Sequence, residues 1–289
     1  LCLSIMLLKN YFQMLLTSSL WGSSFLLMKL ALEELDPFQI SFYRIFIGMV
    51  FINLIRIKKV KISFSDHFYT ALVGFLWMSL PFYLFAESEQ TITSSLAGLV
   101  NGSTPIFISL FGVLFFSQKI SNIKKVYLFT GFVGIYILTF GFQTANLELS
   151  RGFALALLAS VSYGFAANFV QPLIRTYGAL GTLRIALRYA TFFSFILFSI
   201  NSEFFLPTIN GSMPPMLLLG IGGSGVAFLS FYKLIDDVGA IFGSITVYII
   251  PIFSVLFGYI FLQEMTSLSQ ISGVSVIILS AYLFTKTTD

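Results

Sequence analysis

The sequence predicts an all-helical membrane protein of about ten transmembrane helices, arranged as two inverted five-helix repeats around a central cavity. Hydrophobic residues make up 57% of the chain and charged residues only 10%, against roughly 25% charged residues in a soluble domain. Apolar runs of about 17–25 residues recur along the chain, which is the length that a membrane-spanning helix needs. In addition, an apolar segment that begins at Pro105 occurs again at Pro251.

The apolar runs are continuous, without the alternation of apolar and polar residues that a membrane β-barrel requires. The connections between them are short, and the longest falls at 201–213. In chain order, the expected spans are roughly 11–31, 38–55, 68–86, 92–116, 126–142, 152–173, 183–200, 214–232, 240–262 and 270–285.

Basic residues predict the orientation of these spans. If the N-terminus is cytoplasmic, the inner segments hold Lys9, Arg56, Lys58, Lys59, Lys61, Lys119, Lys124, Lys125, Arg175, Lys233 and Lys286, while the outer loops hold only Arg151. This is the bias of the positive-inside rule. We therefore expect an integral membrane protein, in a bacterial cytoplasmic (inner) membrane, with both termini cytoplasmic. The net charge of +4 follows from that topology, so nucleic acid is not an expected partner.

The second half of the chain repeats the first. Aligned without gaps, 98–138 matches 244–284 and pairs Pro-Ile-Phe with Pro-Ile-Phe. An odd number of spans in each half gives the halves opposite orientations. We thus expect one repeat in 1–146 and the other in 147–289, with a pocket near the membrane midplane between them.

The first two spans also carry motifs of a known family. The run Leu20-Trp21-Gly22-Ser23-Ser24-Phe25, followed by Lys29, resembles the first-helix motif of the EamA-like branch of the drug/metabolite transporter superfamily. Pro37 with Arg44 is similar to the Pro…Arg pattern of that family's second helix, and the proline-bearing fourth and ninth spans are similar to its paired motifs.

This resemblance covers essentially the whole chain, as two EamA-like repeats. It implies ten helices, a central cavity between the repeats, and export or uptake of small metabolites such as amino acids. The second half departs from the pattern, because Tyr163 replaces the tryptophan and Arg188 corresponds only loosely to Arg44. The two halves are therefore not expected to contribute equivalent ligands.

The repeated prolines are the expected helix breaks. Proline has no backbone N–H and blocks the carbonyl four residues earlier, so Pro105 and Pro251 should bend or open the fourth and ninth helices. Freed backbone groups are tolerated at membrane depth only against protein or a wet cavity. The polar residues beside each break could thus line a pocket, or could hold helices together in a simple kink.

Polar and aromatic residues of the spans give the candidate cavity lining. The set is Trp21, Ser24, Arg44, Trp77, Tyr83, Asn101, Thr104, Asn168, Gln171, Thr246 and Tyr248. Asn168 and Gln171 are three residues apart, so they should share a face of the sixth helix. For each of these side chains, helix packing remains the alternative to a role in binding.

Arg44 is the clearest charge within a span. It follows Pro37 by seven residues, which places it about 10 Å deep by helical rise. Insertion at such depth costs at least ~2.5 kcal/mol, so the side chain should face the interior or reach toward the interface. Two roles remain open: binding a substrate carboxylate, and pairing with backbone carbonyls.

Several other classes of site are excluded or disfavoured. The single Cys and single His exclude a disulfide framework and a metal site of these ligands, and no cofactor is expected. The run Gly220-Ile-Gly-Gly-Ser-Gly225 formally matches G-x-G-x-x-G, but it lies in an apolar span without the βαβ context of dinucleotide binding. We expect these glycines to permit close helix packing.

The resulting functional prediction is a secondary transporter that moves a small metabolite, such as an amino acid or a related amphiphile, by alternating access. Its expected partners are this metabolite and membrane lipids. The alternatives are a passive channel, which would favour a continuous polar stripe, and a membrane-embedded enzyme acting on a lipid-like substrate. The enzyme would need clustered acids, His or a Ser/Lys pair at membrane depth. The predicted spans contain no such group, so we do not expect an enzyme. Among the acids only Glu87 lies close to a span, so no buried proton site is expected.

Overall fold

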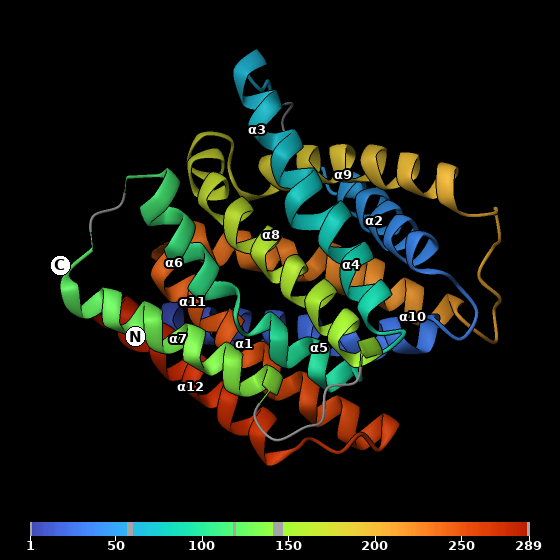
Figure 1. The fold of residues 1–289 in the computed structure, drawn as a ribbon. Helices are drawn as coiled ribbons and strands as arrows, with labels where there is room; N and C mark the ends of the chain where they lie inside the picture. The colour runs from blue at the N-terminus through green and yellow to red at the C-terminus, as the bar shows by residue number, and fades with distance from the viewer. Residues whose placement is uncertain (1, 57–59, 118–119, 141–146, 288–289) are drawn as a thin grey trace.

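The computed structural model describes residues 2–56, 60–117, 120–140 and 147–287, and this part of the chain contains helices but no strand. Figure 1 shows them packed into one bundle. The elements are α1 (Cys2–Ala31), α2 (Pro37–Leu54), α3 (Phe64–Gly74), η1 (Phe75–Ser79), α4 (Leu80–Ser88), α5 (Ser94–Asn101), α6 (Thr104–Phe115), α7 (Asn122–Phe140), α8 (Leu147–Tyr177), α9 (Ala179–Asn201), α10 (Met213–Leu217), η2 (Leu218–Val226), α11 (Ala227–Leu262) and α12 (Leu268–Lys286).

Several of these elements join end to end into spans. Seven stretches are long and apolar enough to cross a membrane: Leu8–Ala31, Pro37–Leu54, Phe64–Ser88, Ser94–Phe115, Arg151–Tyr177, Ala179–Asn201 and Met213–Asp237. Thr246–Leu262 and Leu268–Phe284 are shorter apolar helices. The predicted all-helical membrane fold is confirmed.

Polar residues in the loops set where the spans begin. Asp36 caps α2 by accepting hydrogen bonds from the backbone N–H groups of Phe38 and Gln39, and Gln39 completes a capping box. Ser267 and Gln270 form the same box at the start of α12. Each cap satisfies backbone donors that the first turn of a helix leaves unpaired.

Two predicted spans, 214–232 and 240–262, both contribute to the element α11 (Ala227–Leu262). Their contacts with α1 give their directions. In the span Met213–Asp237, the later residue contacts the earlier part of α1: Asp237 bonds Lys9, and Gly223 bonds Trp21. This span is therefore antiparallel to α1. In Thr246–Leu262, the contacts follow the same order as in α1: Thr246 bonds Ser18, and Phe253 lies against Gly22. This helix is therefore parallel to α1. The two limbs therefore run in opposite directions and count as two crossings.

Equivalent glycines mark where the two repeats cross. A Cβ on Gly22 of α1 would lie 2.4 Å from the Cβ of Phe253, and one on Gly164 of α8 would lie 2.3 Å from that of Phe107. Phe107 and Phe253 occupy the same position of the repeated Pro-Ile-Phe segment. The first helix of each half thus crosses the proline-bearing helix of the other half in the same way, as two inverted repeats require.

Contacts between loops fall at the two ends of the bundle, as alternating crossings predict. At the end that holds the start of α1, the pairs are Lys9 with Asp237, Asp66 with Tyr177, and Arg184 with the Ile55 carbonyl. At the other end, the pairs are Glu34 with Ser212, Glu87 with Arg151, and Glu264 with Ser94. Each pair joins segments that the predicted topology places on the same side.

The two repeated prolines were expected to break their helices alike, but only Pro105 stands at a break, which corrects that expectation. At Pro105 the helix is interrupted: α5 ends at Asn101, and α6 begins at Thr104. Pro251 instead lies inside α11, which continues through it. Both prolines are buried, and the Pro251 ring lies within 2.8 Å of where a Cβ on Gly102 would be. The fourth span is therefore broken and the ninth is not.

The structure adds a feature that the sequence did not predict. Two π-helical segments interrupt the third and eighth spans, η1 at Phe75–Ser79 and η2 at Leu218–Val226. These spans occupy equivalent places in the two repeats. The wider π-turn displaces backbone hydrogen bonds, and such segments are frequent at functional sites.

Candidate substrate cavity

A cavity of about 150 Å³ lies at the centre of the bundle. A single water molecule needs roughly 10–15 Å³ of such space, so the cavity admits a small organic molecule. Its lining comes from both repeats: Trp21, Ser24, Phe25, Met28, Arg44, Trp77, Phe82, Phe85, Asn101, Thr104, Ile108, Tyr163, Ala167, Gln171, Phe228, Phe231, Ile235, Val247 and Ile250.

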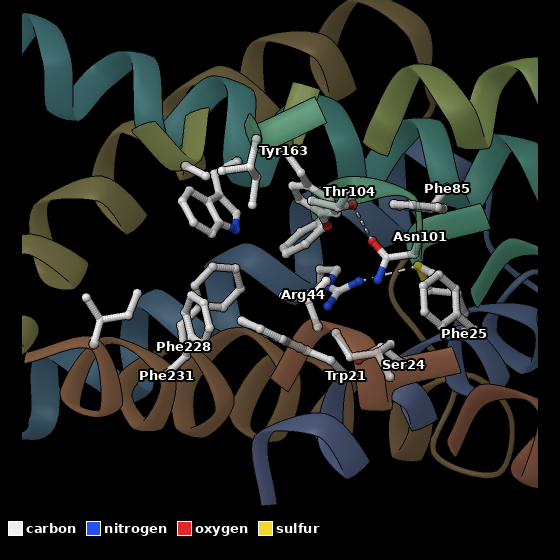
Figure 2. A pocket seen from close by; sticks show the side chains of 18 of the residues that line it. Trp21, Ser24, Phe25, Arg44, Phe85, Asn101, Thr104, Tyr163, Phe228 and Phe231 are labelled. Atoms are coloured by element: carbon white, nitrogen blue, oxygen red, sulfur yellow. Dashed lines mark hydrogen bonds between the residues drawn. The ribbon is translucent and has the colours of Figure 1, made fainter. Parts of the chain in front are cut away.

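Many of the residues selected from the sequence meet at this cavity. They are Trp21, Ser24, Arg44, Trp77, Asn101, Thr104 and Gln171. Figure 2 shows Arg44 in the middle, with Phe228 and Phe231 toward one side and Phe25 and Phe85 toward the other. The arrangement is a small polar centre between aromatic walls.

Four other selected residues do not line the cavity. Tyr83 stacks on Phe38 with ring centroids 4.2 Å apart. Thr246 is fully buried against α1, where its carbonyl accepts a hydrogen bond from Ser18. Tyr248 is buried in the hydrophobic core, while its neighbour Val247 reaches the cavity.

Asn168 is the fourth, and it corrects the expectation that it works with Gln171. Its amide nitrogen donates to the carbonyls of Ile108 and Gly164, at 3.3 and 3.0 Å. It therefore joins α8 to α6, which is the packing role. On α8 the cavity instead receives Ala167 and Gln171, which are four residues apart and hence share a face.

Sequence reasoning missed most of the aromatic lining. Phe228 and Phe231 contact Trp21, with ring centroids 5.1 and 5.0 Å from the indole. In a chain with 35 Phe residues, composition cannot distinguish these from lipid-facing side chains. Tyr163 was accessible to reasoning, because the repeat aligns it with Trp21.

Arg44 is 2% exposed and has neutral partners. Its Nε donates to the Ser224 hydroxyl at 3.3 Å, and its Nη1 lies 3.3 Å from the sulfur of Met28. The guanidinium carbon stands 3.6 Å from the centre of the Phe82 ring, within the range of a cation–π interaction. Within the described ranges of the chain, no carboxylate forms an ion pair with Arg44.

The π-helical segment η2 positions both Arg44 and Trp21. Besides the Ser224 contact, the Gly223 carbonyl accepts a hydrogen bond from the indole N–H of Trp21 at 3.1 Å. A Cβ on Gly223 would lie 2.8 Å from the Ser24 hydroxyl and 3.2 Å from Nη2 of Arg44. The glycine-rich run therefore serves close packing, and it lets the guanidinium lie against the helix.

The broken helix supplies an amide beside Arg44. Thr104 donates to Oδ1 of Asn101 at 3.4 Å. The amide nitrogen of Asn101 consequently points toward Arg44 (Figure 2). Both residues flank the break before Pro105, so the break places polar groups at the cavity.

A buried acid, Glu89, lies within electrostatic range of Arg44. Lys29 donates to the backbone carbonyls of Glu89 and Ile92. Glu89 is fully buried, and among the described residues neither of its carboxylate oxygens has a hydrogen-bond partner. The acids close to the spans thus include the buried Glu89 as well as Glu87. Glu89 lies one residue beyond the span Phe64–Ser88, and no residue pattern around it indicates that this loop folds inward.

Comparison with known proteins agrees with this architecture. The model of the EamA-like transporter family matches residues 8–140 and 150–286. The chain belongs to the EamA-like transporter family. The two matched regions correspond to the two expected repeats, and the boundary between 146 and 147 stays a prediction, since 141–146 lie outside the described residues.

Relatives of similar length carry transporter names. An uncharacterized transporter of Archaeoglobus fulgidus is 24% identical over 96% of this chain and 99% of its own. The uncharacterized transporter YoaV of Bacillus subtilis is 23% identical over 93% of this chain and 94% of its own. A solved crystal structure superimposes with a TM-score of 0.66 at 15% identity, over 96% of this chain and 95% of that chain, and shows the shared fold. The protein is an integral membrane transporter of this family.

Proposed function

We propose that this EamA-like protein is a secondary transporter that moves a small amphiphilic metabolite across the cytoplasmic membrane by alternating access. The observation that carries the proposal is the cavity, which is lined by both repeats at the point where they cross. In inverted-repeat transporters the substrate site lies at the repeat interface near the membrane midplane, and rocking of the repeats opens it to each side in turn.

Contacts between the repeats at both ends of the bundle suit such a motion. At one end Lys9 pairs with Asp237, and at the other Arg151 pairs with Glu87. Each pair joins one repeat to the other, and each consists of a partly exposed ion pair, which contributes little net stability. Either ion pair can therefore separate at modest cost.

The alternatives explain the same features less well. A passive channel favours a continuous polar path, whereas this cavity is bounded along its length by aromatic side chains. A membrane-embedded enzyme needs a nucleophile beside a base, or clustered acids. The lining residues of the cavity include neither.

The membrane and the orientation are part of the proposal. The excess of Lys and Arg in alternate loops favours a cytoplasmic location of both termini. Tags at the two ends that become accessible to protease only after permeabilisation of intact cells would agree with this. A tag accessible from outside at either end would contradict it.

Counterflow tests the transport mechanism. Purified protein is reconstituted into vesicles loaded with a mixture of common amino acids and short organic acids, and the same mixture, radiolabelled, is added outside. A carrier accumulates label transiently above its equilibrium level and saturates with concentration. A flux that never exceeds equilibrium and does not saturate would indicate a channel instead.

A further inference from the structure

We infer that the substrate of this cavity is an organic anion, with a carboxylate bound by Arg44, an apolar body and no compensating positive charge. This rests on the proposed function and narrows its substrate from amphiphiles in general to those of net negative charge. It also separates the two roles that the sequence left open for Arg44.

The first step is the electrostatics of Arg44. Its partners are a hydroxyl, a thioether and an aromatic ring, none of which carries a negative charge. A buried charge is strongly unfavourable without a counter-ion, and an ionisable residue at membrane depth is a functional site by default. In the described part of the chain, no backbone carbonyl accepts a hydrogen bond from the Arg44 guanidinium, whereas the Ile52 and Ile55 carbonyls accept from Arg184. An anion in the cavity supplies the missing partner.

The surrounding charges strengthen this argument. Lys29 is a second cation, which donates to the Glu89 backbone carbonyl and acts electrostatically on the Glu89 carboxyl. Glu89 acts electrostatically on Arg44 at longer range, but its oxygens are buried without hydrogen bonds, which favours the neutral carboxyl.

The polar lining is suited to a carboxylate and not to an ammonium group. The Asn101 amide nitrogen points toward Arg44 (Figure 2), so two donors face the same space. Arg presents its donors as a planar fork that matches a carboxylate. In the described part of the chain, no Asp or Glu lines the cavity to receive an ammonium group. A zwitterion would also leave the positive charge of the site unbalanced.

The rest of the cavity is suited to an apolar body. Trp21, Phe228 and Phe231 form one aromatic cluster, and Trp77 joins it with a ring centroid 6.2 Å from Phe231. Apolar surfaces of this kind bind hydrocarbon without fixing its orientation, while the few polar groups fix where the charged end lies.

Two matched sets of probes test the inference. Phenylalanine and leucine are compared with their deaminated acids, hydrocinnamate and isocaproate, and with their decarboxylated amines, phenethylamine and isoamylamine. Within each set the body is shared and the charge changes. Binding is measured as the rise in unfolding temperature of the purified protein, because a ligand that binds only the folded state stabilises it by mass action. We expect the acids to bind at least tenfold more tightly than the amino acids, and the amines not to bind.

Variants connect this selectivity to Arg44. Arg44→Gln should abolish stabilisation by the acids, and Arg44→Lys should weaken it while keeping the preference for anions. Ser224→Ala removes the hydroxyl that accepts from Nε of Arg44 and should also weaken stabilisation by the acids. This variant tests the role of Arg44 if Arg44→Gln does not fold. Arg188→Gln is the matched control, since Arg188 is exposed and bonds Asn53 away from the cavity; binding should be unchanged.

Several binding outcomes would overturn the inference. One is that amino acids or amines bind as tightly as the acids. Another is that acid binding survives the loss of Arg44. A third is that the acids do not bind at all. Counterflow of amino acids alone would contradict the anionic substrate but leave the transporter intact. Acid binding without any counterflow would support the anion site and contradict the transport mechanism.

Discussion

Buried acids at the ends of the helices fall into two kinds, according to whether hydrogen bonds compensate their charge. Glu264, in the loop after α11, accepts four hydrogen bonds from the backbone and hydroxyl groups of Ser94 and Ser95. These lie at the N-terminus of α5, where helix dipoles favour a negative charge. Glu89 has no hydrogen bond to its carboxylate. The two acids should therefore respond to pH in opposite directions.

Glu264→Ala should destabilise the protein by about 2 kcal/mol, because hydrogen bonds to a charged group contribute about 1.5–3 kcal/mol each and this carboxylate is half-buried. Burial alone would raise the pKa of Glu264, but the bonds from Ser95 and Ser94 lower it overall. Its contribution is thus present above the ordinary glutamate pKa and is lost as the pH falls through the lowered value. Thermal unfolding in detergent at neutral and acidic pH measures this.

The control for this substitution is Glu33→Ala, which changes an exposed acid in the loop after α1. It should leave the unfolding temperature unchanged. Equal unfolding temperatures for Glu264→Ala and the unsubstituted protein at neutral pH would show that the capping bonds contribute nothing.

Glu89→Gln should change the pH dependence in the other direction. Burial raises the pKa of Glu89 well above its ordinary value; the charge of Lys29 opposes this shift, that of Glu264 adds to it and that of Arg44 opposes it. Glu87 on the same helix is paired with Arg151 of α8, and Tyr163 of α8 faces Arg44. The folded state therefore binds a proton that the unfolded state releases, so stability falls as the pH rises from the ordinary glutamate pKa toward the raised one.

The measurement is the unfolding temperature across that pH range, with Glu33→Gln as the control. Glu89→Gln should remove part of the decline, since the amide carries no charge at either pH. A decline as steep in Glu89→Gln as in the unsubstituted protein would mean that Glu89 is not the group that titrates.

The two copies of the proline segment show how far helix breaks can be predicted from the sequence. Both prolines were expected to break their helices, and Pro105 does. The residues before it are Gly102, Ser103 and Thr104, whereas Tyr248, Ile249 and Ile250 precede Pro251. Glycine and serine accept a turn readily, while the bulky apolar residues continue the helix and pack. The proline alone therefore did not decide the outcome.

The same scale shows why the candidate site was only partly predictable. The sequence identified polar lining residues at a helix break or within a span, because such residues are costly in lipid and few in number. Asn168 and Gln171 satisfied that rule equally, yet only Gln171 reaches the cavity. Which helix face meets a neighbour depends on packing across the repeats. The π-helical segment η2, which holds Arg44 and Trp21, has no sequence signature of the kind that caps and prolines provide.

Gly22→Ala and Gly164→Ala should each destabilise the protein, by about 1–3 kcal/mol, which is typical of overpacking. In both, the new Cβ would lie within 2.4 Å of a phenylalanine Cβ in the other repeat. If the crossings are equivalent, the two unfolding temperatures should fall by similar amounts. Gly222→Ala is the control, because its Cβ would meet only the end of the Leu20 side chain, at 3.3 Å. A drop for Gly22→Ala without one for Gly164→Ala would contradict the equivalence.

The whole molecule combines close crossings at its centre with ion pairs at its ends. The first helix of each repeat packs on the proline-bearing helix of the other, and α7 packs along α12. The central contacts join glycine to backbone and allow little separation, while the pairs at the ends involve partly exposed side chains. A motion that opens either end should therefore turn about the crossings, with the cavity beside them.

Reversible cross-links test whether both ends must open. In a Cys2→Ser background, Lys9→Cys with Asp237→Cys joins the repeats at one end, and Glu87→Cys with Arg151→Cys joins them at the other. Bridging either pair with a reducible bifunctional reagent should abolish counterflow, because alternating access needs each end to open in turn. Reduction should restore it. The control, Glu87→Cys with Gln90→Cys, uses a position of the second pair but links residues within one repeat, so its bridge should leave transport unchanged. A passive pathway through a fixed structure would keep its flux with either end bridged, and that result would exclude alternating access.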